Sequence, residues 1–274
     1  MNKIFLYYQP KLIQLIKALN LIGVELTLVG GAVRDFIGFN KFSNDLDIEL
    51  TTDINIKSFD LFIDDIIQAL NSIGVNSVEK LPYNILRFNY NNFMIELSPG
   101  RIESFVDGDF GHKNFSASYI LSKDSERKWK RRDLTINAIG VNLSSGMIID
   151  PFSGRDDIRD KILRHINENF YRDPVRLLRL LRFKLLLGYR MSREIMIENF
   201  IMKDLSLFHL FREGDKCGLS AMLNELQKIK LNENVKFSRD YQILMDFSGK
   251  RTFINFRQMV FCIAKSRDEN LEEF

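Results

Sequence analysis

The stretch from Leu26 to Leu50, LTLVGGAVRDFIGFNKFSNDLDIEL, brings a glycine turn and a row of carboxylates into one short unit. An apolar run over residues 24–29 has the composition of a strand and stops at Gly30 and Gly31. Glycines lack a Cβ atom, so the backbone can turn tightly there and a phosphate can approach its N–H groups. A short helix is expected next, and its first turn would direct backbone donors and Arg34 toward an anion.

The end of this stretch, residues 45–50, alternates strictly between acidic and apolar residues. On a strand, this alternation places Asp45, Asp47 and Glu49 on one face and the apolar side chains on the core face. Adjacent carboxylates repel each other unless a cation lies between them, and Mg²⁺ suits one or two carboxylates plus substrate phosphates. A lone Gly-Gly is usually only a turn, and a lone Asp-x-Asp is more often a solvated sheet face. The combination, with Arg34 in between, favours nucleotide chemistry.

Composition narrows the class of protein. The 274 residues suffice for one large domain or two small ones, and 45% hydrophobic and 27% charged residues are typical of a soluble globular protein. No apolar run reaches the roughly 18 residues of a membrane span, and the N-terminal MNKIFLYY is too short for a signal peptide, so we expect a cytoplasmic protein without membrane association. Cys217 and Cys262 have no metal-ligand spacing, which fits a reducing compartment, and no feature indicates a protein partner.

The net charge of +3 is unevenly distributed. Residues 123–190 hold sixteen Lys and Arg against nine Asp and Glu, a local balance of +7, so the rest of the chain carries −4. Such a basic region can attract phosphate backbones, although many such regions are only solvated helix faces.

Periodicity predicts amphipathic helices over residues 10–22 and 57–73 and short strands over residues 75–79, 85–90 and 93–97. The Asn91-Asn92 pair is a hairpin signal between the last two strands. On its strand, Glu96 would face the side of Asp45 and Asp47, as a third carboxylate or as a solvated residue.

Residues 99–118 contain three glycines and no sustained period, which predicts a mobile loop. Residues 122–130 are predicted to be helical and lead into RRDLTINA, residues 131–138. Its two arginines, carboxylate and amide offer partners for a triphosphate and a ribose, or form a structural ion-pair cluster. A hairpin is expected over residues 140–149, and the DPFSG sequence after it indicates a domain boundary at residue 150.

The second half reads as helical. Asp173 and Pro174 have the preferences of a helix start, and Arg176, Arg179 and Arg182 then recur every third residue, so they would line one broad face of the helix. That face would hold an anion or remain a solvated arginine face.

Three motifs in order, LVGGAVRD followed by DLD, then RRDLTINA, then LRHINENFYRDPVRLLRLLRF, resemble the class II tRNA nucleotidyltransferases and the related bacterial poly(A) polymerases. The resemblance covers residues 26–183. It implies an α/β head of the polymerase β-type nucleotidyltransferase fold over residues 1–150, followed by an all-helical neck and reduced body over residues 151–274. It also implies addition of CCA to tRNA 3′ ends from CTP and ATP by two-metal phosphoryl transfer, with poly(A) polymerase and a catalytically weakened RNA-binding protein as alternatives.

The resemblance also assigns roles to residues. Asp45 and Asp47 would bind Mg²⁺, while Gly30, Gly31 and Arg34 would shape the phosphate site. Arg132, with Asp133 and Asn137, would contact phosphate and ribose. Asp173 and Arg176 would read the incoming base, and Arg179 and Arg182 would bind nucleotide. Arg172 departs from the family pattern, which has glutamate at this position, and the chain is short for the family.

Overall fold

The computed structural model describes residues 3–105, 111, 115–200, 202, 205–233, 237–248, 258 and 263. The chain divides into two compact units, and each is described by itself. The head unit comprises residues 1–104 and 116–160, and the helical unit comprises residues 105–115 and 161–274. The sequence predicted one boundary, at residue 150, whereas the units divide at Asp160 and the segment 105–115 groups with the second unit.

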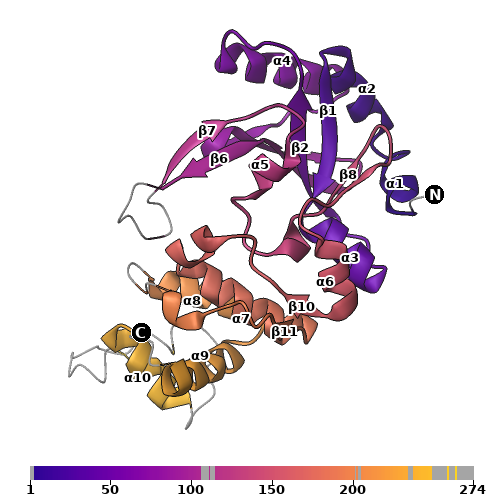
Figure 1. Ribbon diagram of the computed structural model, residues 1–274. Coiled ribbons are helices and arrows are strands. Elements are labelled where there is room, and N and C mark those ends of the chain that lie inside the picture. Colours follow the sequence, from indigo (N-terminus) through magenta and orange to yellow (C-terminus); the bar gives the residue numbers. More distant parts are fainter. Residues whose placement is uncertain are drawn as a thin grey trace. The chain divides into compact units, whose positions relative to one another are not determined.

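A seven-stranded mixed sheet forms the head unit (Figure 1). Its strand order is β3-β4-β5-β2-β1-β8-β9, in which β2 and β5 are parallel and the other neighbours are antiparallel. The strands are β1 (Val24–Val29), β2 (Asp45–Thr52), β3 (Glu79–Leu81), β4 (Ile85–Tyr90), β5 (Phe93–Pro99), β8 (Gly140–Asn142) and β9 (Ile148–Ile149).

The two faces of this sheet differ as the alternation predicted. Leucines and isoleucines of β1, β2 and β5, such as Leu28, Ile48 and Ile95, are completely buried. In Figure 1, α2 (Ile13–Leu21) and α4 (Phe59–Ser72) lie together at one end of β1 and β2, and α2 contacts both β1 and α4. The opposite, polar face carries Asp45, Asp47 and Glu49, so the predicted separation of carboxylates from core residues is confirmed.

Local sequence explains how these elements end. Ser58 accepts a hydrogen bond from the backbone N–H of Leu61 and caps α4, one residue before the helix begins. Asn91 and Asn92 have positive φ angles of 48° and 66°, as a two-residue hairpin turn between β4 and β5 requires. The remaining helices of the head unit are α1 (Lys3–Tyr8), α3 (Gly31–Phe39), α5 (Ser125–Trp129) and α6 (Gly154–Asp160), with 3₁₀ turns η1 (Pro82–Asn84) and η2 (Thr135–Asn137).

Some local predictions were wrong. The strand expected over residues 75–79 forms only from Glu79 onward, and the helix expected from Pro10 begins at Ile13. The predicted mobile loop at 99–118 contains an antiparallel hairpin of β6 (Arg101–Ser104) and β7 (Ser116–Tyr119). Residues 106–110 and 112–114 of that predicted loop lie outside the described residues, as does Cys262.

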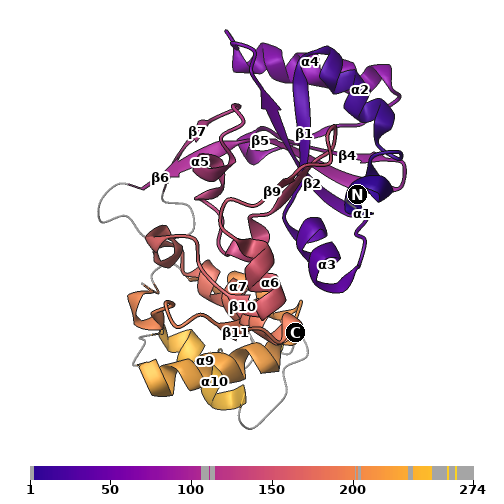
Figure 2. The ribbon, with the colours of Figure 1, turned by 45° about the vertical axis from the view of Figure 1, so that its right-hand side comes forward.

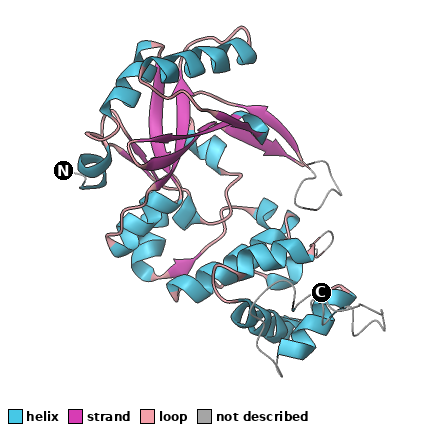
Figure 3. Cartoon of the chain, turned by 180° about the vertical axis from the view of Figure 1, so that it is seen from behind, coloured by secondary structure: helices cyan, strands magenta, loops and turns pink. Residues whose placement is uncertain are grey.

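Helices dominate the described part of the helical unit (Figures 2 and 3). They are α7 (Val175–Leu187), α8 (Leu207–Gly214), α9 (Leu219–Glu233) and α10 (Arg239–Ser248), with 3₁₀ turns η3 (Glu168–Arg172) and η4 (Ile197–Asn199). One small parallel pair, β10 (Ile162–Leu163) and β11 (Arg190–Met191), interrupts a region that was expected to be wholly helical. Four leucines in the first half of α7, Leu177, Leu178, Leu180 and Leu181, are buried, whereas Leu186 near its end is exposed. The helices α7, α8 and α9 contact one another.

No helix in the described ranges is long and apolar enough to cross a membrane.

Candidate active site

The turn after β1 brings three predicted site residues together. Gly30 has φ 74° and ψ −133°, a conformation that is accessible almost only to glycine. A Cβ atom on Gly30 would lie 3.1 Å from Asp47 Oδ2 and 3.6 Å from Arg132 Nη1. The missing side chain therefore leaves room beside a carboxylate and a guanidinium that converge on the same turn. Gly31 begins α3, and a Cβ there would make an ordinary contact with Arg34, 3.6 Å from Nη2.

Asp45 and Asp47 are exposed on the polar face of β2. Val29, the last residue of β1, pairs with Asp47, so the carboxylates lie at the end of the sheet where the glycine turn begins. Glu96 of β5 pairs with Asp47 in register and therefore shares its face, as predicted. Its carboxylate binds Arg87 of β4 at 2.6 Å, which gives Glu96 an ion-pair partner within the sheet.

The RRDLTINA segment forms a network with Arg34. The Arg34 Nη1 atom donates to Asn137 Oδ1 at 2.6 Å, and Asn137 Nδ2 donates to Asp133 Oδ1 at 2.9 Å. Arg132 Nη1 donates to the carbonyl of Asn137 at 3.2 Å. Asp133 and Asn137 are buried, so their hydrogen bonds restrict the positions of the Arg34 and Arg132 side chains. The structure thus brings together Arg34, Arg132, Asp133 and Asn137, which are separated in sequence.

Arg132 retains unused hydrogen-bonding capacity. Among the residues that the structure describes, its buried Nε atom has no hydrogen-bond partner, and its guanidinium carbon lies 5.6 Å from the Trp129 ring centroid. Desolvation, with the nearby charge of Arg132, lowers the pKa of Arg131 to about 10, so Arg131 still carries its charge at neutral pH. The charge of Arg132, which meets Asp47 at the glycine turn, provides a local field that can attract a phosphate chain.

The sequence did not predict a buried ion pair between α5 and β2. Lys128 of α5 and Glu49 of β2 are each 1% exposed and lie 2.8 Å apart, and Trp129 Nε1 donates to both carboxylate oxygens of Glu49. Glu49 was predicted to share the face of Asp45 and Asp47, which is confirmed, but α5 covers it with its own cation. The sequence around Lys128 and Trp129 gave no signal of this contact, because Glu49 lies 80 residues before Trp129.

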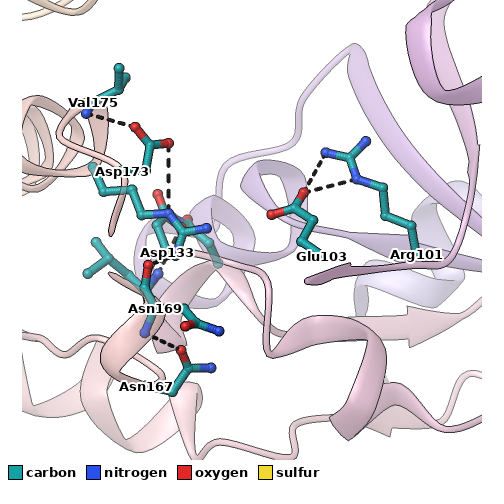
Figure 4. Close-up of polar contacts among 10 residues, drawn as sticks. Arg101, Glu103, Asp133, Asn167, Asn169, Asp173 and Val175 are labelled. Atoms are coloured by element: carbon teal, nitrogen blue, oxygen red, sulfur yellow. Dashed lines mark hydrogen bonds and ion pairs between the residues drawn. The ribbon is translucent and has the colours of Figure 1, made fainter. Parts of the chain in front are cut away.

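In the helical unit, the predicted base-reading residues lie at the start of α7. Asp173 Oδ1 accepts a hydrogen bond from the N–H of Val175 at 2.9 Å, so Asp173 caps the helix as expected from sequence (Figure 4). Its other carboxylate oxygen lies 4.0 Å from Arg176 Nε, and Arg176 Nη1 donates to the carbonyl of Asn169 at 3.4 Å. Figure 4 also shows the Asn169 N–H donating to the side chain of Asn167, which caps η3. In β6, the same figure shows the Arg101 guanidinium donating to the Glu103 carboxylate.

The other arginines of α7 do not form a solvated face. Arg176 and Arg182 are buried, and Arg182 forms a short ion pair with Glu213 of α8 and stacks on Phe183, 4.4 Å from the ring centroid. Arg179 lies 5.7 Å from the same ring. The solvated-face alternative is therefore wrong for Arg176 and Arg182, and the charge of Arg182 is balanced within its own unit.

Comparison with known proteins decides the family. The family model described as the poly A polymerase head domain matches residues 26–164, half of the chain. The chain belongs to this family. The matched residues include Gly30, Asp45, Asp47 and Arg132, the residues that the structure gathers around the glycine turn.

Relatives with curated names agree with this family. Over 107 residues, the chain is 42% identical to a CCA-adding enzyme of Buchnera aphidicola subsp. Baizongia pistaciae, covering 38% of this chain and 25% of the relative. Over 176 residues, it is 48% identical to the CCA-adding enzyme of Buchnera aphidicola subsp. Cinara cedri, covering 61% and 36%. The matches span only 22% to 39% of the first three curated relatives.

Solved structures support the fold. A Bacillus stearothermophilus CCA-adding enzyme in complex with CTP aligns with TM-score 0.61 and 24% identity, covering 86% of this chain and 56% of that chain. A tRNA nucleotidyltransferase complexed with a primer tRNA and an incoming ATP analog aligns with TM-score 0.55 and 20% identity, covering 93% and 71%. The expected α/β nucleotidyltransferase head followed by helices is therefore confirmed.

Proposed function

We propose that this chain is a template-independent RNA nucleotidyltransferase that adds C and A to tRNA 3′ ends, using CTP, ATP and Mg²⁺. The observation that carries the proposal is the convergence of Gly30, Asp47 and Arg132 at the end of a sheet that also exposes Asp45. The names of the relatives support the choice of tRNA and CCA addition.

The donors at this turn fit Mg²⁺. Gly30 leaves space beside Asp47 Oδ2 that any Cβ atom would fill. Mg²⁺ prefers one or two carboxylates together with substrate phosphates, and Asp45 and Asp47 supply two carboxylates on one strand face. When bound, Mg²⁺ would acidify the RNA 3′-hydroxyl and neutralise charge that develops on the pyrophosphate.

Asp45 and Asp47, exposed on one face of β2, would hold the metal ion through their carboxylate oxygens. Arg132 would bind the triphosphate through the N–H groups at the edge of its guanidinium, whose carbon lies 5.6 Å from the Trp129 ring centroid. Arg34 would approach the phosphates from the first turn of α3, where the helix dipole also favours an anion. Asp133 and Asn137 would fix both arginines, as their hydrogen bonds already do in this structure.

Base selection would belong to Asp173 and Arg176. A carboxylate accepts from the exocyclic amine of cytosine or adenine, and a guanidinium donates to the neighbouring ring acceptor. Uracil and guanine present the opposite polarity at these positions, which would exclude them. Arg179 and Arg182 remain predicted nucleotide-binding residues, although Glu213 would compete for Arg182.

Poly(A) polymerase is the second candidate, because the matching family model carries that description. A catalytically weakened RNA-binding protein is the third, suggested by Arg172 in place of the family's glutamate. All three would work in the cytoplasm.

The test uses purified protein, Mg²⁺ and single labelled nucleotides with tRNAs that end before CCA, after CC, or after the complete CCA. We expect C addition to the first, A addition to the second and none to the third. Long A tails on unrelated RNAs would indicate a poly(A) polymerase, and efficient UTP or GTP incorporation would overturn the base-selection proposal. Asp45→Ala and Asp47→Ala should each abolish incorporation, whereas Asp60→Ala, an exposed carboxylate of α4, should not.

A further inference from the structure

The N-terminal helix α1 reaches the loop that precedes β2. Tyr8, the last residue of α1, is 0% exposed, and its hydroxyl binds both backbone groups of one residue, Ser43. It accepts from Ser43 N–H at 2.8 Å and donates to the Ser43 carbonyl at 2.9 Å. Its ring packs edge-on against Phe93 at 5.7 Å, and both α1 and Tyr8 precede the residues that the family model matches.

Ser43 passes this restraint on to Asp45. The Ser43 Oγ atom accepts from the Asp45 N–H at 3.0 Å and donates to the Asp45 carbonyl at 2.9 Å. Two pairs of hydrogen bonds therefore connect the Tyr8 hydroxyl, through Ser43, to the backbone of Asp45.

The position of Asp45 in the sheet explains why this restraint matters. On one side, β2 pairs with β5 from Asp45 onward, but on the other side its pairing with β1 ends at Asp47. Asp45 thus extends beyond β1, and Ser43 Oγ binds the backbone groups that a neighbouring strand would otherwise bind. Without a partner, the end of a strand frays, and the direction of its side chain becomes variable.

We propose that Tyr8 is a positioning residue for Asp45. Acting through Ser43, it holds the backbone of Asp45 so that its carboxylate stays on the same face of β2 as that of Asp47. The inference rests on the proposed function for its metal-binding consequence, but not for the order that it gives to the end of β2. Catalytic groups need to be held within about 0.5 Å of their productive geometry, and a strand end held on one side only does not meet that need.

The Tyr8 hydroxyl is suited to this task at working pH. Burial is the main cause that raises the pKa of Tyr8, so the hydroxyl keeps its proton and can donate and accept at once. Ring contacts with Tyr7, Phe42 and Phe93 fix the orientation from which it does so.

The adjacent tyrosine provides a matched control. The Tyr7 ring stacks on Phe42, with centroids 3.7 Å apart, and Lys11 Nζ lies 3.2 Å from the Tyr7 ring centroid. Among the described residues, the Tyr7 hydroxyl makes no hydrogen bond. Tyr7→Phe therefore removes a hydroxyl from the same helix while leaving Ser43 and Asp45 bound as before.

Two measurements on the full chain test the proposal. The first is amide hydrogen exchange at Asp45, and the second is the affinity for Mn²⁺ without nucleotide, measured by electron paramagnetic resonance. We expect Tyr8→Phe and Ser43→Ala each to accelerate exchange at Asp45 and weaken Mn²⁺ binding by at least about fivefold, because each variant loses two hydrogen bonds. Because the two residues act in series, the double variant should lose little more than either single variant. Tyr7→Phe should match the wild-type protein in both measurements.

Unchanged exchange and Mn²⁺ affinity in Tyr8→Phe, even with a lower Tm, would overturn the proposal and leave Tyr8 a packing residue only. Faster exchange with unchanged Mn²⁺ affinity would also overturn it. Asp45→Ala distinguishes this failure from failure of the proposed function: if that variant binds Mn²⁺ like the wild-type protein, the metal assignment is wrong, whatever Tyr8 does.

Discussion

At the scale of single residues, Gly30 controls how closely the backbone approaches Asp47 and Arg132. Gly30→Ala adds a methyl group 3.1 Å from Asp47 Oδ2 at a φ of 74°. We expect a loss of about 1–3 kcal/mol in the free energy of unfolding, from backbone strain, and a loss of at least tenfold in nucleotide addition, from the displaced carboxylate. Urea unfolding and single-nucleotide addition rates measure the two effects separately.

Gly74→Ala is the control for strain without crowding. Gly74 has φ 86°, and a Cβ atom there would meet nothing within 4 Å. This variant should lose stability by a comparable amount and keep its activity. If both variants lose activity equally, the space beside Asp47 is not what Gly30 provides.

Arg172 occupies the position at which the resemblance to the tRNA nucleotidyltransferases leads us to expect a glutamate. Arg172→Glu would place a carboxylate four residues before Arg176, where it can orient the guanidinium, so discrimination of CTP and ATP against UTP and GTP should improve by up to about tenfold. Arg172→Gln removes the positive charge without adding a carboxylate and should not give this gain. Ratios of kcat/KM for the four nucleotides measure the effect. Unchanged or poorer selectivity in Arg172→Glu would mean that this position does not help to read the base.

At the scale of elements, strict alternation predicted strands correctly. The acidic face of β2 follows from period two, and burial alternates along the first residues of both β2 and β4. β1 was predicted from its apolar composition, because most of its residues are buried. The short helix α1 and the β6–β7 hairpin have no such period. They are held by distant partners, as Tyr8 is by Ser43, which sequence spacing cannot reveal.

The helix α5 depends on the same kind of distant contact. Removing one partner of the Lys128–Glu49 pair leaves the other charge buried, so Lys128→Met or Glu49→Gln should each lower the free energy of unfolding by about 3–5 kcal/mol. The double variant leaves no buried charge and keeps an acceptor for Trp129, so it should lose much less than the sum of the two. Urea unfolding measures all three.

The exposed pair of the same helix is the control. Lys130 and Glu126 lie 3.4 Å apart with more than half of each side chain exposed, so Glu126→Gln should change stability by less than about 1 kcal/mol. Additive losses for Lys128 and Glu49 would contradict an energetic coupling between them.

At the scale of the whole molecule, the sequence overestimated the basic surface. Of the cations in the basic segment 123–190, several are neutralised by internal carboxylates, among them Lys128 with Glu49, Arg182 with Glu213 and Lys184 with Glu225. A charge count has no information about partners outside the counted segment. Motif order, in contrast, singled out Gly30, Asp47 and Arg132, which the structure brings together. The roles of these three residues, and of Asp173 in the other unit, stay predictions.

Under the proposed function, residues of the head unit would perform the chemistry and residues of the helical unit would select the base. Asp173→Asn isolates selection, since asparagine can still cap α7 by accepting from Val175 N–H while its amide NH₂ can donate to the O4 acceptor of uracil. We expect the preference for CTP over UTP to fall by about tenfold or more, with CTP addition reduced and UTP addition gained. Asp45→Asn should instead lower kcat/KM for all four nucleotides by a similar factor, because metal binding does not depend on the base. If Asp173→Asn lowers the four values equally, Asp173 supports α7 only, and base selection lies elsewhere in the chain.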